Sequence, residues 1–517
     1  MAAHAPITPL TPAEVALIKK LNTNSDRATM IAALKANLQT AIEIELATIP
    51  IYLYTYYSLI RDKQLGEGIG AEQQYANKAG GVIMSVAVEE MLHMSLSSNI
   101  LFAMGVAPQL YRNAPKSYPT QLPYHKPTGA AGPDGDRKVL IPLAAFGFEQ
   151  LWHFLQIEYP EKYDTIPLDR NWTTIGQFYS YIRCQIHTCF ITDADFQQGA
   201  AASAIQPYNY SPNNVDTLYP RGKFDPWKPA PPAKMPNWTN ADKFPSAAKA
   251  AAFADAADSH AGPTALMTIS SKRDAAMAID TICDQGEGQA SQLGPSPTDD
   301  PSKKESSHYF KFLTLQAQLA QYPSTHEQLP RIPKPPKPIT PTMNGRALSP
   351  YIVNVPDNPT NAGYPDQYRQ IAAFCSALFQ YMLVMTETIY RVPPVNQKRF
   401  FNEGLHRSMI WVLDKYIRTI RQIPVPGQTR NGLPVMMGPT FQNIDLGPRV
   451  SSFAGLTKFG NQAIAAANAL ITTKPPADVV SALNSVISYV GTALTAANDG
   501  HPMHLPDVSH YWSLADG

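Results

Sequence analysis

Charged residues are scarce in this chain of 517 residues, where Asp, Glu, Lys and Arg together make up only 16 %. The 42 basic and 41 acidic side chains leave no excess of either sign, which argues against nucleic acid and anionic membranes as partners. No apolar run reaches the roughly 18 uninterrupted residues of a membrane span, and residues 1–24 lack the pattern of a signal peptide. We therefore expect a soluble, cytoplasmic protein.

Cysteine is also scarce. The four cysteines are Cys184, Cys189, Cys283 and Cys375. None of them forms a C-x-x-C pair with metal-binding spacing, so we expect free thiols in a reducing compartment. Proline is abundant instead: 48 prolines are spread over long stretches without helical pattern, in a chain long enough for two or three domains.

Pairs of Glu and His three residues apart are more frequent than chance predicts. With 15 Glu and 12 His, random placement gives roughly 0.3 such pairs. The chain has three: Glu90/His93, Glu305/His308 and Glu403/His406. On a helix this spacing turns both side chains toward one face, where they can hold one metal ion.

The first pair lies in a predicted helix over Gly81–Gly105. Apolar and small residues recur along one face of this helix, at Ile83, Val86, Ser97 and Ile100. Glu90 and His93 fall on the same face, so they point toward the core. Since a buried carboxylate without a partner is costly, this helix is a candidate metal-binding arm. Glu89, next to it, is interpreted either as a residue that orients a ligand or as a solvated or capping residue.

A second predicted helix runs from Arg27 to Ile60. Its stripe is Leu34, Leu38, Ile42, Glu45, Ile49 and Leu53. Glu45 therefore occupies an apolar position, whereas Glu43 points elsewhere, and Pro50 is expected to bend the helix. The following tyrosines, from Tyr52 to Tyr57, are interpreted mainly as packing residues, with one tyrosine beside a metal as the alternative.

Two further arms are less strongly marked. Glu287 follows a predicted helix over Pro263–Gly286, where the simple interpretation is an exposed residue at a helix end. Glu305 with Ser302 fits a capping box, which needs no metal, but His308 continues a helical stripe. The region 106–263 is predicted to be a long insertion serving as lid or pocket wall. It contains a helical piece with His153 and Glu158, for which a surface or hydrogen-bonded position is favoured over ligation.

The order Glu45, Glu90-x-x-His93, Glu287, Glu305-x-x-His308 resembles the ferritin-like domain of bacterial and fungal secondary-metabolism proteins. These proteins include the imino-phenylpyruvate dimer synthase of the violacein pathway. The resemblance covers roughly residues 27–320. It implies a mainly α fold, with a four-helix bundle that holds two iron ions. In that pattern the metal ligands are Glu45, Glu90, His93, Glu287, Glu305 and His308, with Glu90 and Glu305 as bridges.

The donor set supports the same chemistry independently. Carboxylates and imidazoles suit iron, with manganese as the alternative, and the absence of thiolate arms argues against structural zinc or iron–sulfur clusters. We therefore predict an O2-dependent di-iron oxidoreductase, an oxidase or oxygenase acting on a small organic substrate. The alternatives are an oxidative coupling enzyme like the imino-acid dimer synthase, whose iron site is altered or joined by haem, and a non-catalytic metal-binding protein. The sequence identifies neither substrate nor electron donor, and it leaves a homodimer open.

The predicted organisation has four parts. They are an N-terminal segment (1–26), the metal-binding bundle (27–320, with the insertion 106–263), a Pro-rich linker (321–359) and a C-terminal helical region (360–517). The third pair, Glu403/His406, lies in the last part, with Glu387 on the preceding helix. Gly404 sits inside the pair and weakens the helix, and no second set of arms follows, so a structural role is favoured there.

Overall fold

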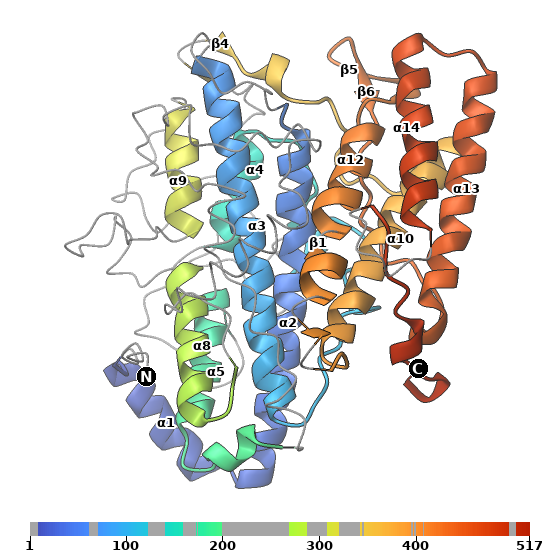
Figure 1. Cartoon of the computed structure of the whole chain (residues 1–517). Coiled ribbons are helices and arrows are strands. Elements are labelled where there is room, and N and C mark those ends of the chain that lie inside the picture. The colour runs from blue at the N-terminus through green and yellow to red at the C-terminus, as the bar shows by residue number, and fades with distance from the viewer. Residues whose placement is uncertain are drawn as a thin grey trace.

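The computed structural model describes residues 9–60, 71–122, 140–158, 172, 174–198, 268–286, 308–319, 342–343, 346–393, 396–397, 400–406, 408–495 and 503–516. Two long helices, α2 (Arg27–Ser58) and α3 (Ala71–Ala103), pack along each other in its N-terminal half (Figure 1). α2 begins after Asp26, whose carboxylate accepts a hydrogen bond from the Thr29 N–H at 2.9 Å. It matches the prediction closely, whereas α3 begins before the predicted Gly81, because packing outweighs the low helix propensity of this buried glycine.

Two pairs of shorter helices form the other side of the bundle. They are α4 (Phe148–Ile157), α5 (Ile175–His187), α8 (Lys272–Gln285) and α9 (His308–Gln318). α5 packs on α8, and α4 packs on α9. The hydroxyls of Thr174 and Ser271 cap α5 and α8 by accepting backbone N–H bonds at 3.1 Å. The prediction of residues 106–263 as an insertion is therefore wrong in part, since α4 and α5 belong to the bundle.

The relative directions of α2, α3, α4 and α9 follow from contacts at one end of the bundle. At this end, the Ser58 hydroxyl accepts from the Phe146 N–H at 2.8 Å, and the Tyr75 hydroxyl donates to the Leu315 carbonyl at 2.7 Å. The end of α2 therefore lies beside the start of α4, and the start of α3 beside the end of α9. This order requires one long crossover between α3 and α4, which carries the ladder of β1 (Thr120–Gln121) with β2 (Leu140–Ile141).

The N-terminal helix α1 (Pro12–Asn24) closes the lower end of the bundle in Figure 1. It begins with a capping box in which the Thr11 and Glu14 side chains each accept a backbone N–H. Glu14 also pairs with Arg183 of α5 at 2.8 Å, which fixes α1 on the bundle.

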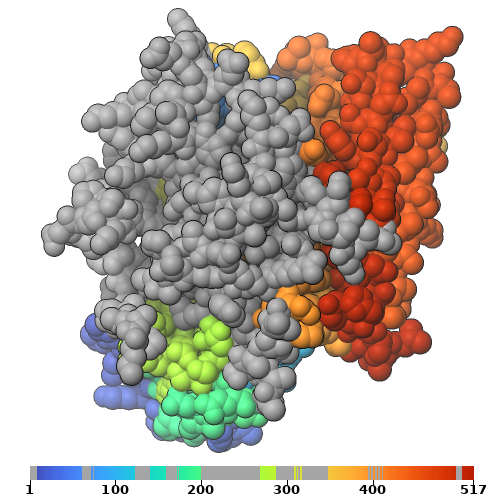
Figure 2. Space-filling view, viewed as in Figure 1, coloured from blue at the N-terminus to red at the C-terminus, as the bar shows by residue number. Residues whose placement is uncertain are grey.

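The C-terminal region is a second group of helices on one side of the molecule (Figures 1 and 2). Its helices are α10 (Asp366–Ile389), α12 (Asp414–Ile420), α13 (Ser452–Thr472) and α14 (Ala477–Ala493). α13 packs against both α10 and α14. α10 is long and apolar enough to cross a membrane, but 94 % of its most apolar window is buried inside the protein, as expected for a core helix.

Shorter elements connect these helices. Two π-helical segments, Phe400–His406 and Ser408–Leu413, precede α12, where the sequence predicted one continuous helix from Asn396 to Ile423. The remaining strands form two antiparallel hairpins: β3 (Thr342–Met343) with β4 (Arg346–Ala347), and β5 (Pro424–Arg430) with β6 (Leu433–Met436). The 3-10 turns are Asp193–Phe196, Ser349–Tyr351, Asn361–Gly363, Arg449–Ser451, Ser509–Tyr511 and Leu514–Asp516.

The bundle and the C-terminal region meet at the end of α2. Leu59 forms an antiparallel bridge with Ile352, so the described end of the Pro-rich linker pairs with the chain at the end of α2. Arg421 of the C-terminal region donates to the carbonyl oxygens of Tyr57 and, at 2.9 Å, of Leu59. These carbonyls at the end of α2 have no partner within the helix, and the guanidinium supplies one.

Candidate metal centre

Two groups of potential metal ligands meet in the interior of the bundle. The first group is Glu45, Glu90 and His93, and the second group is Glu90, Glu158 and His308. Every member is buried, and within each group the ligand atoms lie within 4.8 Å of one another. Glu90 belongs to both groups, as expected for a carboxylate that bridges two ions.

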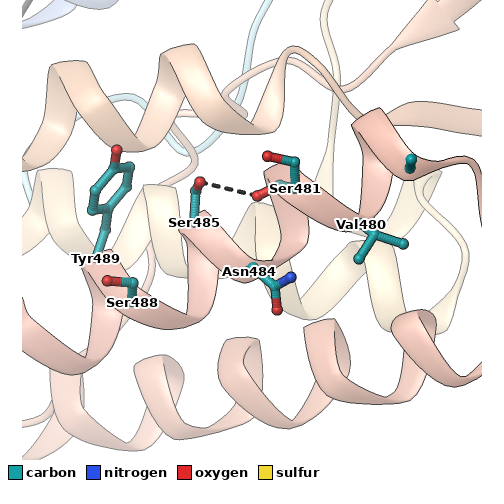
Figure 3. A pocket seen from close by; sticks show the side chains of 7 residues that line it. Val480, Ser481, Asn484, Ser485, Ser488 and Tyr489 are labelled. Atoms are coloured by element: carbon teal, nitrogen blue, oxygen red, sulfur yellow. Dashed lines mark hydrogen bonds between the residues drawn. The ribbon is translucent and has the colours of Figure 1, made fainter.

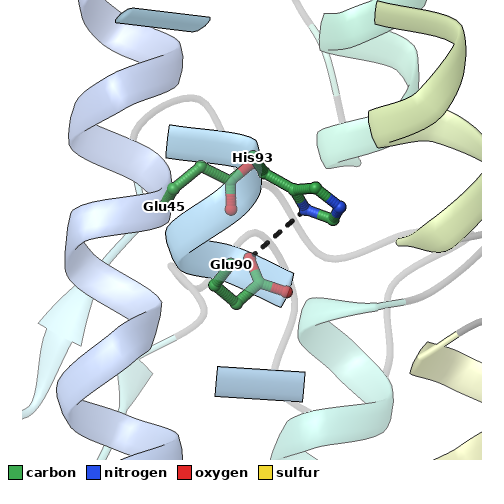
Figure 4. A group of neighbouring side chains, drawn as sticks. All are labelled: Glu45, Glu90 and His93. Atoms are coloured by element: carbon green, nitrogen blue, oxygen red, sulfur yellow. Dashed lines mark ion pairs between the residues drawn. The ribbon is translucent and has the colours of Figure 1, made fainter. Parts of the chain in front are cut away.

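The first group is built from the two long helices. Glu45 extends from α2, and Glu90 and His93 extend from successive turns of α3 toward the same space (Figure 4). The Nδ1 atom of His93 lies 3.9 Å from the nearer Glu90 oxygen, while its Nε2 lies 3.1 Å from Oε1 of Gln285, the last residue of α8. The Tyr179 hydroxyl of α5 donates to Glu45. All four helical arms therefore contribute to positioning this group.

The second group lies where two of the shorter helices end. Glu158 caps the end of α4, and His308 is the first residue of α9. The His308 Nδ1 lies 2.8 Å from Glu90 Oε1 and 3.5 Å from Glu158 Oε2. On its other side, Nε2 lies 2.6 Å from Glu89, and the same Glu89 oxygen pairs with Lys311 at 2.6 Å. Glu89 is fully buried, so the solvated alternative for this residue is wrong.

Aromatic side chains cover the second group. The Tyr52 hydroxyl donates to Glu158. The Tyr52 ring stacks on Phe312 at 5.4 Å between centroids, and Phe154 meets both rings edge-on or tilted at 4.8 Å. Tyr52 therefore fits the alternative interpretation of the tyrosine run, in which one hydroxyl lies beside the candidate metal site. Tyr56 illustrates the other interpretation, since its hydroxyl accepts from Arg418 at 2.8 Å, away from the cluster.

The ionisable groups perturb one another strongly. Burial and the neighbouring Glu90 raise the pKa of Glu45 well above its ordinary value. Burial acts in the same direction on Glu90, but its polar contacts with Glu45, His308 and His93 prevail and hold the pKa of Glu90 well below its ordinary value. Burial would lower the pKa of His308, yet the carboxylates of Glu158, Glu89 and Glu90 raise it well above the usual value. Bound cations would displace the protons that the raised pKa values of Glu45 and His308 favour.

The orientation of the donor atoms fits a pair of cations. Glu90 Oε1 and His308 Nδ1 are only 2.8 Å apart, but both are buried and neither has a hydrogen-bond partner. Two ligands of one ion stand about 3 Å apart when each is roughly 2.1 Å from it at a right angle. Carboxylate and imidazole donors suit iron or manganese. Glu45 and His93 would hold one ion and Glu158 and His308 the other, with Glu90 between them.

The structure brings together four of the six predicted ligands: Glu45, Glu90, His93 and His308. Glu287 and Glu305 lie outside the described residues, so their predicted roles stay predictions. For Glu158 the sequence favoured a surface or hydrogen-bonded position over metal ligation. In the structure its side chain is only 4 % exposed and belongs to the second group. The only signal in the sequence was a Glu directly after a short apolar helical pattern. His153 is half-buried and belongs to neither group.

The third predicted pair, Glu403/His406, is not tested by the structure. Glu403 and His406 fall within the π-helical segment Phe400–His406, and their side chains lie outside the described part of the chain. Glu387 has a structural role, since it accepts from the Leu110 N–H at 2.6 Å and forms a buried ion pair with Arg449. This arrangement agrees with the structural role favoured for Glu387, and the role of Glu403/His406 stays a prediction.

A hollow on the surface lies away from the Glu/His cluster's helices. It has a volume of about 510 Å³ and lies along α14 (Figure 3). The lining residues are Ala477, Val480, Ser481, Asn484, Ser485, Ser488 and Tyr489. All of them come from one helix, and they include no carboxylate, imidazole or thiol. We therefore assign no chemistry to this hollow, in contrast to the Glu/His cluster.

The comparison with known proteins agrees with the architecture. The model of the family described as ferritin-like matches residues 38–220 and 239–317, which together are just over half of the chain. The chain therefore belongs to the ferritin-like family, and the predicted ferritin-like bundle is confirmed. A crystal structure of a ferritin-like protein from Caulobacter vibrioides is similar, with 19 % identity, coverage of 74 % of this chain and 93 % of that chain, and a TM-score of 0.38. None of the curated proteins matches.

Proposed function

We propose that this protein is a non-haem dinuclear iron oxidase or oxygenase that uses O2 to oxidise a small organic substrate. The observation that carries the proposal is the sharing of Glu90 by two buried ligand groups. The chemistry that a pair of ferrous ions would supply at these residues is electron transfer to dioxygen. The resemblance to secondary-metabolism proteins supports a biosynthetic role, which we include in the proposal.

The residues of the chain have distinct parts in this function. Glu45, Glu90 and His93 hold one ion, while Glu90, Glu158 and His308 hold the second, and Glu287 and Glu305 are candidates to complete the set. Tyr179 and Tyr52 orient the carboxylates of Glu45 and Glu158 by donating hydrogen bonds to them. The rings of Tyr52, Phe154 and Phe312 exclude water from one side of the site, which strengthens the electrostatic interactions within it.

The proposal is tested by loading the protein with Fe(II) anaerobically and then admitting oxygen. We expect about two iron ions per chain, no haem absorption band, and oxygen consumption by the loaded protein. Glu90→Ala and His308→Ala abolish iron retention and oxygen consumption but keep most of the helix content. Glu43→Ala is the matched control, since Glu43 lies on α2 but bonds to Gln39 and Asn113 instead of the cluster.

The outcomes separate the alternative functions. Full iron occupancy in both ligand variants contradicts the ligand assignment. Two iron ions that are retained without oxygen consumption favour a non-catalytic metal-binding protein. A haem band favours the oxidative coupling enzyme.

A further inference from the structure

The two histidines of the centre differ in what their outer nitrogen contacts. His308 Nε2 lies 2.6 Å from a carboxylate oxygen of Glu89. His93 Nε2 lies 3.1 Å from Oε1 of Gln285, a neutral amide. In both residues Nδ1 faces the ligand groups, so Nε2 carries the hydrogen and donates it outward when Nδ1 binds a metal.

This difference affects the strength of each histidine as a ligand. A hydrogen bond to an ionised acceptor is shorter and roughly twice as strong as one between neutral groups. An imidazole that donates to a carboxylate therefore gains more electron density at Nδ1 and binds a metal more tightly. Lys311 pairs with the same Glu89 oxygen at 2.6 Å, and this ammonium compensates the buried charge while leaving a carboxylate as the acceptor.

We infer that the two metal positions have unequal affinities, set by Glu89 on one side and Gln285 on the other. The position of Glu90, Glu158 and His308 fills first, and the position of Glu45, Glu90 and His93 fills second. Glu89 and Gln285 are positioning residues, since each acts through a histidine. The inference rests on the proposed function in requiring two metal ions, but it concerns their order of binding and not the reaction.

The experiment is a titration of the metal-free protein with Mn(II) alone, followed by electron paramagnetic resonance. With one equivalent, we expect mainly the signal of single Mn(II) ions, and with two equivalents the signal of a spin-coupled pair. The two dissociation constants should differ by at least about tenfold, the lower limit for the loss of an outer hydrogen-bond partner. His93→Ala keeps the first, tight step, whereas His308→Ala loses it.

Two reciprocal variants test the cause of the difference. Glu89→Gln weakens the first step by about 10- to 100-fold. Gln285→Glu gives His93 a carboxylate acceptor. This variant strengthens the second binding step and reduces the difference between the two dissociation constants. Because Glu89→Gln leaves Lys311 without its ion pair, the double variant Glu89→Gln/Lys311→Met is measured as well, with helix content as a check on folding. Glu43→Gln, a carboxylate outside the cluster, leaves both steps unchanged.

Each result decides the question. Two equal steps in the natural protein, or a tight step kept by His308→Ala and lost by His93→Ala, overturn the inference. Unequal steps that Glu89→Gln and Gln285→Glu leave unaltered also overturn it, because the assigned cause is then absent. Failure of the proposed function gives a different result from failure of this inference. If Mn(II) binds in the expected order but the iron-loaded protein consumes no oxygen, the inference stands and the oxidase proposal fails.

Discussion

Replacing Glu45 by glutamine is expected to make the metal-free protein more stable at neutral pH and the metal-loaded protein less stable. Burial and Glu90 raise the pKa of Glu45 in the folded state, so the folded protein keeps a proton that the unfolded chain loses above its ordinary value of 4.5. Stability contributed by this group is therefore lost as the pH rises from that value toward the folded pKa, by up to about 1.4 kcal/mol per pH unit. Glutamine needs no proton, and its amide retains the hydrogen bonds to Tyr179 and Glu90.

The magnitude is bounded by what buried polar groups ordinarily cost. We expect Glu45→Gln to gain about 1–3 kcal/mol at pH 7 without metal, and almost nothing at pH 4. With Mn(II) at 100 times its dissociation constant, the natural protein gains about 2.7 kcal/mol, while the variant has lost a charged ligand and gains less. Urea unfolding with hydrogen-exchange readout on α2 and α3 peptides measures both effects. A metal-free variant that is less stable at pH 7, or a gain independent of pH, refutes the reasoning. Glu43→Gln serves as the control, with a change within about 0.5 kcal/mol.

Three other variants test the surroundings of the site and the packing of the C-terminal region. Tyr52→Phe removes the hydrogen bond to Glu158 but keeps the ring, so we expect metal affinity to fall by about tenfold in a Mn(II) titration with unchanged helix content. Unchanged affinity would show that Glu158 needs no orientation by this hydroxyl. Gly455→Ala places a methyl group 2.1 Å from the Leu446 carbonyl oxygen. Thermal unfolding should therefore show that the free energy of unfolding falls by about 1–3 kcal/mol, as for other overpacked substitutions. Gly491→Ala, with open space around it, should instead gain about 0.5–1 kcal/mol as a helix substitution.

Three of the four predicted ligands that the structure brings together lie on the two long helices. Glu45, Glu90 and His93 belong to α2 and α3, where many turns of apolar periodicity establish which face is buried. A charged residue on that face then stands out. Glu158 comes at the end of the ten-residue α4, where the pattern is too short to predict whether the last side chain points inward.

Contacts between distant segments could not be predicted. Gln285 and His93 are 192 positions apart, and nothing in the local pattern shows that the end of α8 faces α3. The same limit applies to Glu387, a buried acid whose partner Arg449 lies on another element. Without that partner in view, a buried carboxylate on a helix is equally consistent with a metal site and with a structural ion pair.

Metal binding is expected to stabilise α9 more than any helix of the C-terminal region. α9 begins with His308, and its next turn carries Lys311, so its first turn is held largely by the buried Glu89, Glu90 and Glu158. Two cations would neutralise these carboxylates and fix the His308 ring, whereas α14 contributes to neither ligand group. Hydrogen exchange of α9 peptides should therefore slow by up to about 100-fold at 100 times the dissociation constant of Mn(II), if exchange follows opening of the site. Peptides from α14 are the internal control and should exchange at the same rate. Equal slowing in both would indicate a general effect of the metal on the whole protein and would contradict a local centre at the start of α9.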